Sequence, residues 1–314
     1  MYRRRIVFLG LLCILPFLTS CSINKIAVNA VSNLLTGTGS ADVFTTDNDP
    51  ELVGDALPFA IKLYETLLSQ NPDHQGLMLT TGSLFVMYAN AFVQGPAEML
   101  DPVGYYYERT EATERAKKLY LRGNALLSTA LDKKFPGFSK ATVEDGSLEG
   151  FLKKCKKDDV SLLYWTVAGG IAAYSLDVFD FDLGSHIPEW DAMLARAYEL
   201  DSEFNNGAID ELYIMYYAAL PEHIGGDKDK AEIHFVRALE KSNYLSAGPY
   251  VSYAKSICIP AQDYDAFEDN LQKALAIDPD ANPSSRLVNT LAQRKARFLL
   301  DTADEYFADE YYSN

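Results

Sequence analysis

From Asp49 onward, apolar side chains recur at spacings of three and four, which is the pattern of a helix that buries one face. The first such run begins at Pro50, a residue favoured in the first turn of a helix, and stops at Gln70-Asn71-Pro72. Its apolar positions include Val53, Leu57 and Ile61. The pattern therefore predicts an amphipathic helix over this segment.

The same spacing predicts helices along almost all of the remaining chain. Their expected limits are Gln75 to the break at Gly95-Pro96, Val103–Leu131, Asp159–Asp177, Pro188–Leu200, Asn206–Ala219, Lys228–Lys241, Leu245–Cys258, Asp263–Ile277 and Asn282–Tyr306. The polar stretch from Ser139 to Asp159 is expected to be mostly loop with one short helix. Because the alternating apolar-polar runs typical of strands are missing from the sequence, we predict an all-α fold.

Three of the predicted helices have similar endings. These endings are Ala197-Tyr198-Glu199-Leu200-Asp201, Ala238-Leu239-Glu240-Lys241-Ser242-Asn243 and Ala274-Leu275-Ala276-Ile277-Asp278-Pro279. Each resembles the close of a tetratricopeptide repeat, whose period is ~34 residues; the first interval is longer than this and the second is close to it. We therefore predict tetratricopeptide-like helical hairpins stacked into an α-solenoid, with a generic helical bundle as the alternative.

The N-terminus has the features of a bacterial lipoprotein signal. Arg3-Arg4-Arg5 precedes an apolar stretch, which ends in Leu18-Thr19-Ser20-Cys21 and is too short to be a permanent membrane span. We predict a signal peptide over residues 1–20, acylation of Cys21, a tether over 21–48 and a helical domain over 49–314. Ser22 follows the cysteine where Asp would suggest retention at the inner membrane, so a periplasmic, outer-membrane address is favoured.

Charge and cysteine content narrow the possible partners. The chain carries a formal charge of −16, which repels phosphate backbones, so we expect no nucleic-acid partner. Cys155 lies in a lysine-rich run and is expected to be a solvated loop thiol, although basic neighbours could make it reactive. Whether it pairs with Cys258 is open from the sequence.

No catalytic or metal-binding pattern stands out. His74, His186, His223 and His234 lack the spacing of three or four that places two metal ligands on one helix face. Nucleophile-elbow, zinc-protease, P-loop and dinucleotide-binding motifs are all missing from the sequence. We therefore expect a binding protein without a catalytic site, metal or cofactor.

Aromatic residues are more numerous than one core stripe needs, so some are expected to line a surface, groove or cavity. Tyr105-Tyr106-Tyr107 is one such group. A tyrosine offers apolar area with a polar tip, which suits an amphiphilic ligand. As ligand-binding residues we predict Tyr164, Trp165, Tyr213, Tyr216, Tyr217 and Phe235.

Several segments carry a family resemblance. They are Leu163-Tyr164-Trp165, Gly207-Ala208 through Ala218-Ala219-Leu220-Pro221, Gly225-Gly226-Asp227-Lys228-Asp229-Lys230-Ala231, Phe235 to Leu239, and Arg286-Leu287-Val288-Asn289-Thr290-Leu291-Ala292-Gln293-Arg294-Lys295-Ala296 running to Leu299-Leu300. Together with the lipoprotein signal, they resemble the T-component family of TRAP-type transporter systems. Within them, Gly225-Gly226 permits a tight turn, and Asp227 is suited to cap the following helix.

This resemblance implies a periplasmic lipoprotein of helical hairpins that forms homo-oligomers, with trimers suspected. It further implies association with the solute-binding (P) subunit of the transporter, and a pore or cleft for a hydrophobic or amphiphilic small molecule. Two other functions stay open from the residues alone. One is a repeat scaffold for outer-membrane protein assembly, and the other is a glycan-binding outer-membrane lipoprotein.

Overall fold

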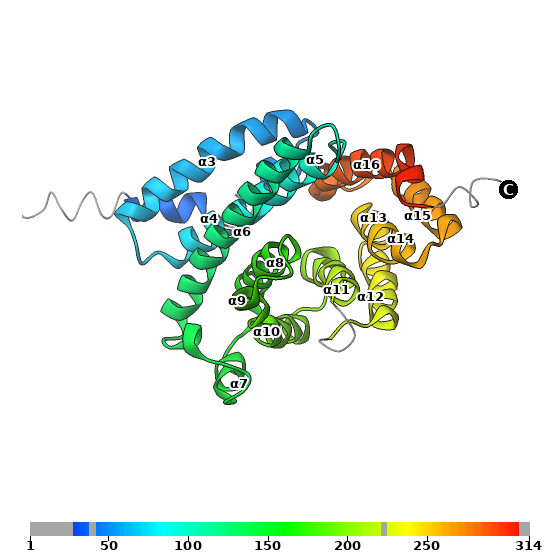
Figure 1. Cartoon of the computed structure of the whole chain (residues 1–314). Helices are drawn as coiled ribbons and strands as arrows, with labels where there is room; N and C mark the ends of the chain where they lie inside the picture. The colour runs from blue at the N-terminus through cyan, green and yellow to red at the C-terminus, as the bar shows by residue number, and fades with distance from the viewer. Residues whose placement is uncertain (1–27, 38–41, 221–224, 308–314) are drawn as a thin grey trace, which may run out of the picture.

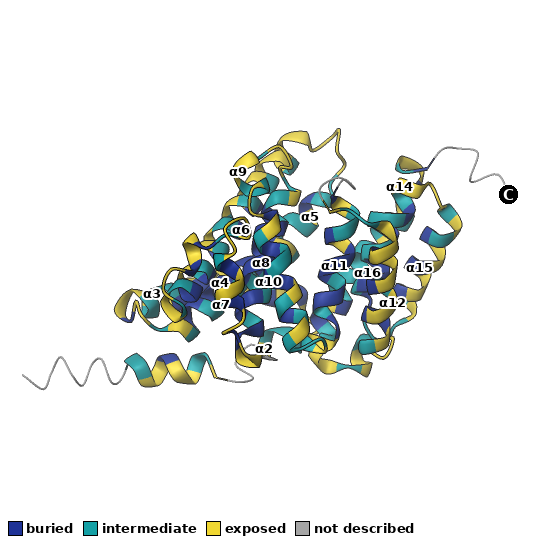
Figure 2. Ribbon diagram, turned by 90° about the horizontal axis from the view of Figure 1, so that it is seen from below, coloured by how far each residue is buried: buried dark blue, intermediate teal, exposed yellow. Residues whose placement is uncertain are grey.

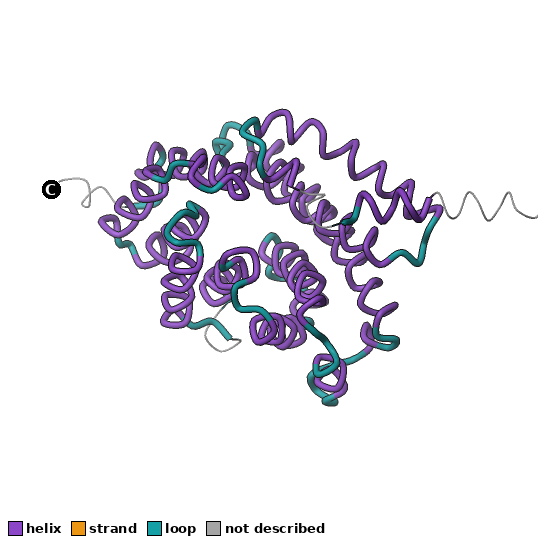
Figure 3. The backbone as a smooth tube through the Cα atoms, turned by 180° about the vertical axis from the view of Figure 1, so that it is seen from behind, coloured by secondary structure: helices purple, strands orange, loops and turns teal. Residues whose placement is uncertain are grey.

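The computed structural model describes residues 28–37, 42–220 and 225–307. Across these residues the chain is built from helices and connecting loops, and no strand is found in them (Figure 3). The all-α prediction is therefore confirmed. The predicted signal peptide and Cys21 lie outside the described residues.

Three long helices form the N-terminal part of the body. They are α3 (Pro50–Gln70), α4 (Gln75–Ala89) and α6 (Tyr106–Lys134), with α4 packed against both of the others. As predicted, Pro50 occupies the first turn of α3, where the Asp49 side chain accepts a hydrogen bond from the Leu52 N–H. Helices α4 and α6 approach closely at Gly82 and Gly123, because a Cβ on Gly123 would lie 2.7 Å from the Gly82 carbonyl oxygen.

The helix predicted to break at Gly95-Pro96 instead continues for another turn, so that prediction was wrong. A π-helical turn over Asn90–Gln94 leads into α5 (Gly95–Glu98), and the Gly95 N–H donates to the Asn90 carbonyl. A widened turn accommodates the proline, which lacks an N–H donor and would crowd a regular α-helix. A second π-helical turn, η6 (Ala254–Cys258), precedes Pro260 in the same way and leads into α14. This helix therefore continues beyond the end predicted at Cys258.

The rest of the chain consists of shorter helices. The middle part contains η2 (Phe138–Lys140), α7 (Ser147–Leu152), η3 (Lys157–Asp159), α8 (Val160–Ser175), α9 (Phe181–Gly184), α10 (Ile187–Leu200), η4 (Phe204–Asn206) and α11 (Ala208–Ala219). The C-terminal part contains α12 (Lys228–Lys241), α13 (Gly248–Tyr253), η6, α14 (Ile259–Ala261), α15 (Tyr264–Ala276), η7 (Pro279–Ala281), η8 (Pro283–Ser285), α16 (Arg286–Asp301) and η9 (Ala303–Glu305).

Successive helices pack in pairs. α8 pairs with α10, α11 with α12, and α13 with α15. The three similar endings noted in the sequence are the C-termini of α10, α12 and α15, the second helix of each pair. Asp227 caps α12 as expected, accepting from the Lys230 N–H at 3.0 Å, and Gly225 adopts the left-handed φ of 114°. This hairpin array fits the predicted solenoid, and its assignment to tetratricopeptide repeats stays a prediction.

The helical array curves so that α16, its last long helix, contacts α3 near the start of the body (Figure 1). Leu287 of α16 packs into the core cluster formed by α3 and α4. Arg294 of α16 pairs with Glu51 of α3 at 2.5 Å, and Arg286 donates to the Thr46 carbonyl at 2.8 Å. The described body is thus a curved array of helices whose two ends are in contact.

The segment before the body also contacts it. A helix over residues 28–35 follows the undescribed N-terminus, and α2 (Asp42–Thr45) packs beside α16. The Tyr64 hydroxyl donates to the Leu35 carbonyl at 2.7 Å, and His74 Nε2 lies 2.9 Å from Asn33 Oδ1. Part of the predicted tether is therefore ordered against α3 and α4.

Cys155 is buried, so the prediction of a solvated thiol was wrong. Its side chain is 2% exposed and belongs to the main core, while the neighbouring lysines face solvent. Burial, assisted by the negative charge of Asp159, raises the pKa of Cys155 to about 11, which also argues against a reactive thiolate. Cys258 lies in a different core cluster, and both thiols are free in the structure.

One apolar stretch among the described residues, Gln75–Glu98, has the length and composition of a membrane span. It comprises α4, its π-helical turn and α5, and half of the window is buried within the protein. Its placement between α3 and α6 accounts for its apolar character, because a helix covered on two sides needs apolar residues on both faces.

Candidate functional site

The six aromatic residues predicted to bind ligand fall into three separate places. Tyr164 and Trp165 of α8 are half-buried and form an edge-to-face pair, with ring centroids 5.2 Å apart. Phe204, just before α11, adds a third ring at 5.2 Å from Tyr164. This first group lies between α8 and the start of α11.

The second place is a stack of rings between α11 and α12. Tyr213 and Tyr217 lie parallel, 5.3 Å apart, and His234 stacks on Tyr213 at 4.4 Å. His234 Nδ1 lies 2.7 Å from Asp210 Oδ1. Because Tyr213 and His234 are both buried, this stack contributes mainly to packing and leaves the partly exposed Tyr217 at its edge.

The buried Asp210 anchors this stack through charge. Its second carboxylate oxygen accepts from Lys241 Nζ at 2.7 Å, and the same ammonium also donates to the Tyr198 hydroxyl and the Ser202 carbonyl. Burial opposes the charge of Lys241, but these hydrogen bonds outweigh it and raise its pKa. The arrangement is a satisfied internal ion pair that ties α12 to α11.

Phe235 lies elsewhere, in the C-terminal core. It stacks on Tyr253 at 4.2 Å and contacts Tyr250 edge-on. Both tyrosines belong to α13, so Phe235 joins α12 to α13 and does not meet the other predicted residues.

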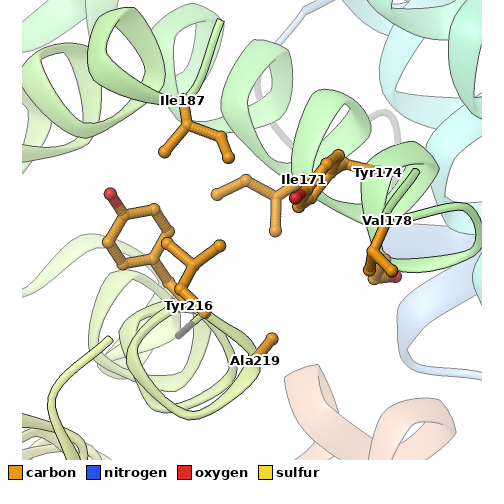
Figure 4. A pocket seen from close by; sticks show the side chains of 8 residues that line it. Ile171, Tyr174, Val178, Ile187, Tyr216 and Ala219 are labelled. Carbon is orange, nitrogen blue, oxygen red and sulfur yellow. The ribbon is translucent and has the colours of Figure 1, made fainter. Parts of the chain in front are cut away.

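A small, shallow apolar pocket opens between the C-terminal ends of α8 and α11 and the start of α10 (Figure 4). Of the six predicted residues only Tyr216 lines it. The other lining residues were missed by sequence reasoning: Ile171, Tyr174, Ser175, Val178, Ile187, Ala219 and Leu220. The lining is almost entirely apolar, apart from the hydroxyl groups of Tyr174, Ser175 and Tyr216.

A carboxylate lies next to the pocket. The Asp191 side chain hydrogen-bonds with Tyr216, and burial raises its pKa even though Lys230 opposes the shift. Lys230 Nζ in turn lies 5.3 Å from the centre of the Tyr217 ring. The pocket therefore combines an apolar lining with polar groups on the α10, α11 and α12 side.

The loop beside the pocket exposes apolar side chains. Phe179 is 81% and Phe181 87% exposed, and Val178 next to them lines the pocket. In Figure 2 the exposed colour covers α9 and its loop, whereas buried residues concentrate along α4, α8 and α10. Lys117 of α6 holds this loop by ion pairs to Asp177 at 2.7 Å and Asp180 at 2.8 Å. Tyr105, Tyr106 and Tyr107 are exposed as well.

Glu211 of α11 is a half-buried carboxylate that forms no ion pair with the described lysines, arginines or histidines. Burial raises its pKa to about 7, against an opposing hydrogen bond from Ser252 of α13. Burial raises the pKa of Tyr164, and the negative charge of Glu211 raises it further. A Cβ on Gly248 would lie 2.3 Å from the Glu211 carboxylate, so the glycine makes room for this side chain.

Glu98 of α5 holds two ammonium groups. Its Oε2 accepts from Lys255 of η6 at 2.8 Å and from Lys295 of α16 at 2.5 Å. Burial would raise the pKa of Glu98, but the two lysines outweigh it and lower that pKa to about 2. The cluster joins three elements far apart in the sequence, so periodicity along the chain could not reveal it.

The described residues contain no group of three or more His, Cys, Asp and Glu side chains that could hold a metal ion. His234 stacks on Tyr213, His186 lies at a tilt beside the Trp190 ring, and His74 caps α4. His223 lies outside the described residues.

Comparison with known proteins identifies the family of this chain. The family model described as the TRAP transporter T-component matches residues 46–307. An uncharacterized protein of Treponema pallidum (strain Nichols) is 36% identical over 307 residues, covering 92% of this chain and 94% of that protein. The chain therefore belongs to the TRAP transporter T-component family.

Proposed function

We propose that this protein is a lipid-anchored accessory subunit that docks the solute-binding subunit of a TRAP-type transporter and exchanges a hydrophobic or amphiphilic ligand with it. Acylated Cys21 anchors the chain to the membrane, in the periplasm and with the outer membrane favoured. The described helical body supplies both the docking surface and the ligand site. Family membership supports the link to the transport system.

The observation that carries this proposal is the apolar loop beside the apolar pocket. Two phenylalanines are more than four-fifths exposed, which is unfavourable unless a partner or ligand covers them. The ion pairs of Lys117 support this loop from α6, so the rings are presented from a supported backbone. A partner that covers Phe179 and Phe181 would also lie across the mouth of the pocket that Val178 lines.

The ligand class follows from the pocket lining. Its apolar walls favour an apolar chain or ring, and the Tyr174 and Tyr216 hydroxyls offer hydrogen bonds to a polar end. Because the pocket is small, it accommodates part of a ligand and leaves the rest in contact with the exposed loop. Tyr164, Trp165, Tyr213, Tyr217 and Phe235 are proposed to shape the surrounding walls.

The test is co-purification from the cell envelope with paired variants. Phe179→Ser combined with Phe181→Ser should reduce the recovered solute-binding subunit to about a tenth, since central aromatic anchors contribute ~2 kcal/mol or more to such interfaces. Phe59→Ser is the matched control, because Phe59 is also 73% exposed but lies on α3. Equal recovery with the double variant and the control would refute this docking surface.

A further inference from the structure

Two lysines in the structure share one carboxylate, so the cluster carries one positive charge more than the carboxylate neutralises. Lys255 and Lys295 both donate to the same oxygen of Glu98, and the second oxygen accepts from Gln94 Nε2 at 2.7 Å. Among the groups in hydrogen-bond contact, two positive charges face one negative charge. This local excess stands out in a chain whose formal charge is −16.

Electrostatics within the cluster point the same way. Burial lowers the pKa of Lys295, Glu98 opposes this effect, and the neighbouring Lys255 lowers it further. The two ammonium groups therefore repel each other, and Glu98 alone does not remove the strain. A second anion placed against Lys255 would do so.

The cluster is accessible to such an anion. The Lys255 side chain is 43% exposed, against 27% for Lys295 and 22% for Glu98. An ammonium group has three donors, and Lys255 uses one of them on Glu98. Donors on the most exposed of the three side chains thus remain for a ligand.

The backbone around the cluster is unusual. Gln94 ends one π-helical turn and Lys255 lies within another, η6, so both π-helical turns of the described residues contribute a side chain to this cluster. π-Helical turns occur frequently at functional sites. A purely structural ion pair between helices needs no such irregularity.

Apolar surface adjoins the charge on α16. Leu291, Lys295 and Phe298 follow one another at spacings of four and three, which places them on one helix face. Both apolar residues are half-buried. Leu291 packs against the core cluster of α3 and α4, whereas Phe298 belongs to none of the three core clusters formed by the described residues. A charged head at the lysines would therefore lie beside an apolar surface suited to a tail.

We infer that Lys255 and Lys295 bind the carboxylate head of an amphiphilic organic acid, whose apolar tail lies along Phe298 and Leu291. This inference goes beyond the proposed function, because it places a ligand site at α5, η6 and α16, apart from the pocket between α8, α10 and α11. Glu211 does not belong to this cluster, because its pKa depends on burial and on Ser252 and not on Lys255.

The experiment compares decanoate with decanol by calorimetric titration into the detergent-solubilised full-length protein at pH 8. The wild type is expected to bind decanoate about tenfold more tightly than decanol, because a charge-assisted hydrogen bond contributes at least that much. Lys255→Met should abolish this preference while leaving the Glu98–Lys295 pair in place. Phe298→Ser should weaken binding of both compounds by a similar factor.

Lys273→Met is the matched control, because Lys273 is an exposed lysine with a single carboxylate partner, Asp269. Equal affinity of the wild type for decanoate and decanol, or an unchanged preference in Lys255→Met, would overturn the head-group site and leave ligand uptake intact. Acetate binding as tightly as decanoate would overturn the role of the tail. Failure to bind any of the three would overturn this site altogether, whereas the pocket and the capture of the solute-binding subunit are tested by the co-purification experiment.

Discussion

Glu98 makes a quantitative prediction about stability. Its pKa falls from the ordinary 4.5 to about 2 in the folded protein, because Lys295 and Lys255 outweigh the effect of burial. This difference corresponds to about 3 kcal/mol of stabilisation of the ionised form. Replacing Glu98 with Gln should therefore lower the free energy of unfolding by about 3 kcal/mol at pH 7, since it also leaves two lysines without their carboxylate.

The sign of the pH dependence follows from the direction of the shift. A carboxylate whose pKa is lowered by folding stabilises the protein above its unfolded pKa, and this contribution disappears as the pH falls from 4.5 towards 2. Urea unfolding followed by circular dichroism between pH 7 and pH 3 measures it. The difference between wild type and Glu98→Gln should shrink steadily over the acidic part of this range.

A surface pair supplies the control. Glu149 pairs with Lys153 one turn away, and both side chains are about 70% exposed, so Glu149→Gln should leave the free energy of unfolding nearly unchanged. If Glu98→Gln behaves like Glu149→Gln, the cluster does not stabilise the packing of α5 with η6 and α16, and the electrostatic argument fails.

Three further predictions concern other parts of the molecule. Glu211→Gln should stabilise the protein by up to about 3 kcal/mol at pH 8, because folding raises the pKa of Glu211 to about 7. The wild type therefore loses stability as the pH rises from 4.5 through 7, and the neutral glutamine avoids this loss. An unchanged urea midpoint at pH 8 would contradict this. Gly170→Ala should cost ~1–3 kcal/mol in thermal unfolding, because a Cβ there would lie 2.4 Å from the Trp190 ring, and a neutral effect would mean that the indole moves freely. Cys21→Ser should abolish incorporation of labelled palmitate and release the protein from the membrane fraction; continued membrane association would argue against the lipid anchor.

Local sequence signals predicted the helices well, because they depend on neighbours within one or two turns. Asp49 and Pro50 begin α3, and Asp227 caps α12, as their residue types suggest. The helix ends predicted at Gly95-Pro96 and at Cys258 were wrong for a physical reason. A π-helical turn before each proline lets the helix continue, and its residues carry no compositional mark.

The candidate site was less predictable, because it depends on contacts between helices. Tyr213 and Tyr217 do meet, as one helix turn separates them, but Phe235 packs into another core. The lysine-rich neighbours of Cys155 concealed its burial, although Leu152, Cys155 and Asp159 share a spacing of three and four that marks an inward face. The cluster joins Glu98 to Lys255 and Lys295, which lie 157 and 197 residues further along the chain, so no local pattern could reveal it.

The measurement that tests the central claim most directly is intact-complex mass spectrometry of the full-length protein captured from its own cell envelope. Our account predicts a solute-binding subunit retained in a fixed ratio, together with a small apolar or amphiphilic molecule. Recovery of outer-membrane assembly proteins instead, or of no solute-binding subunit at all, would contradict it.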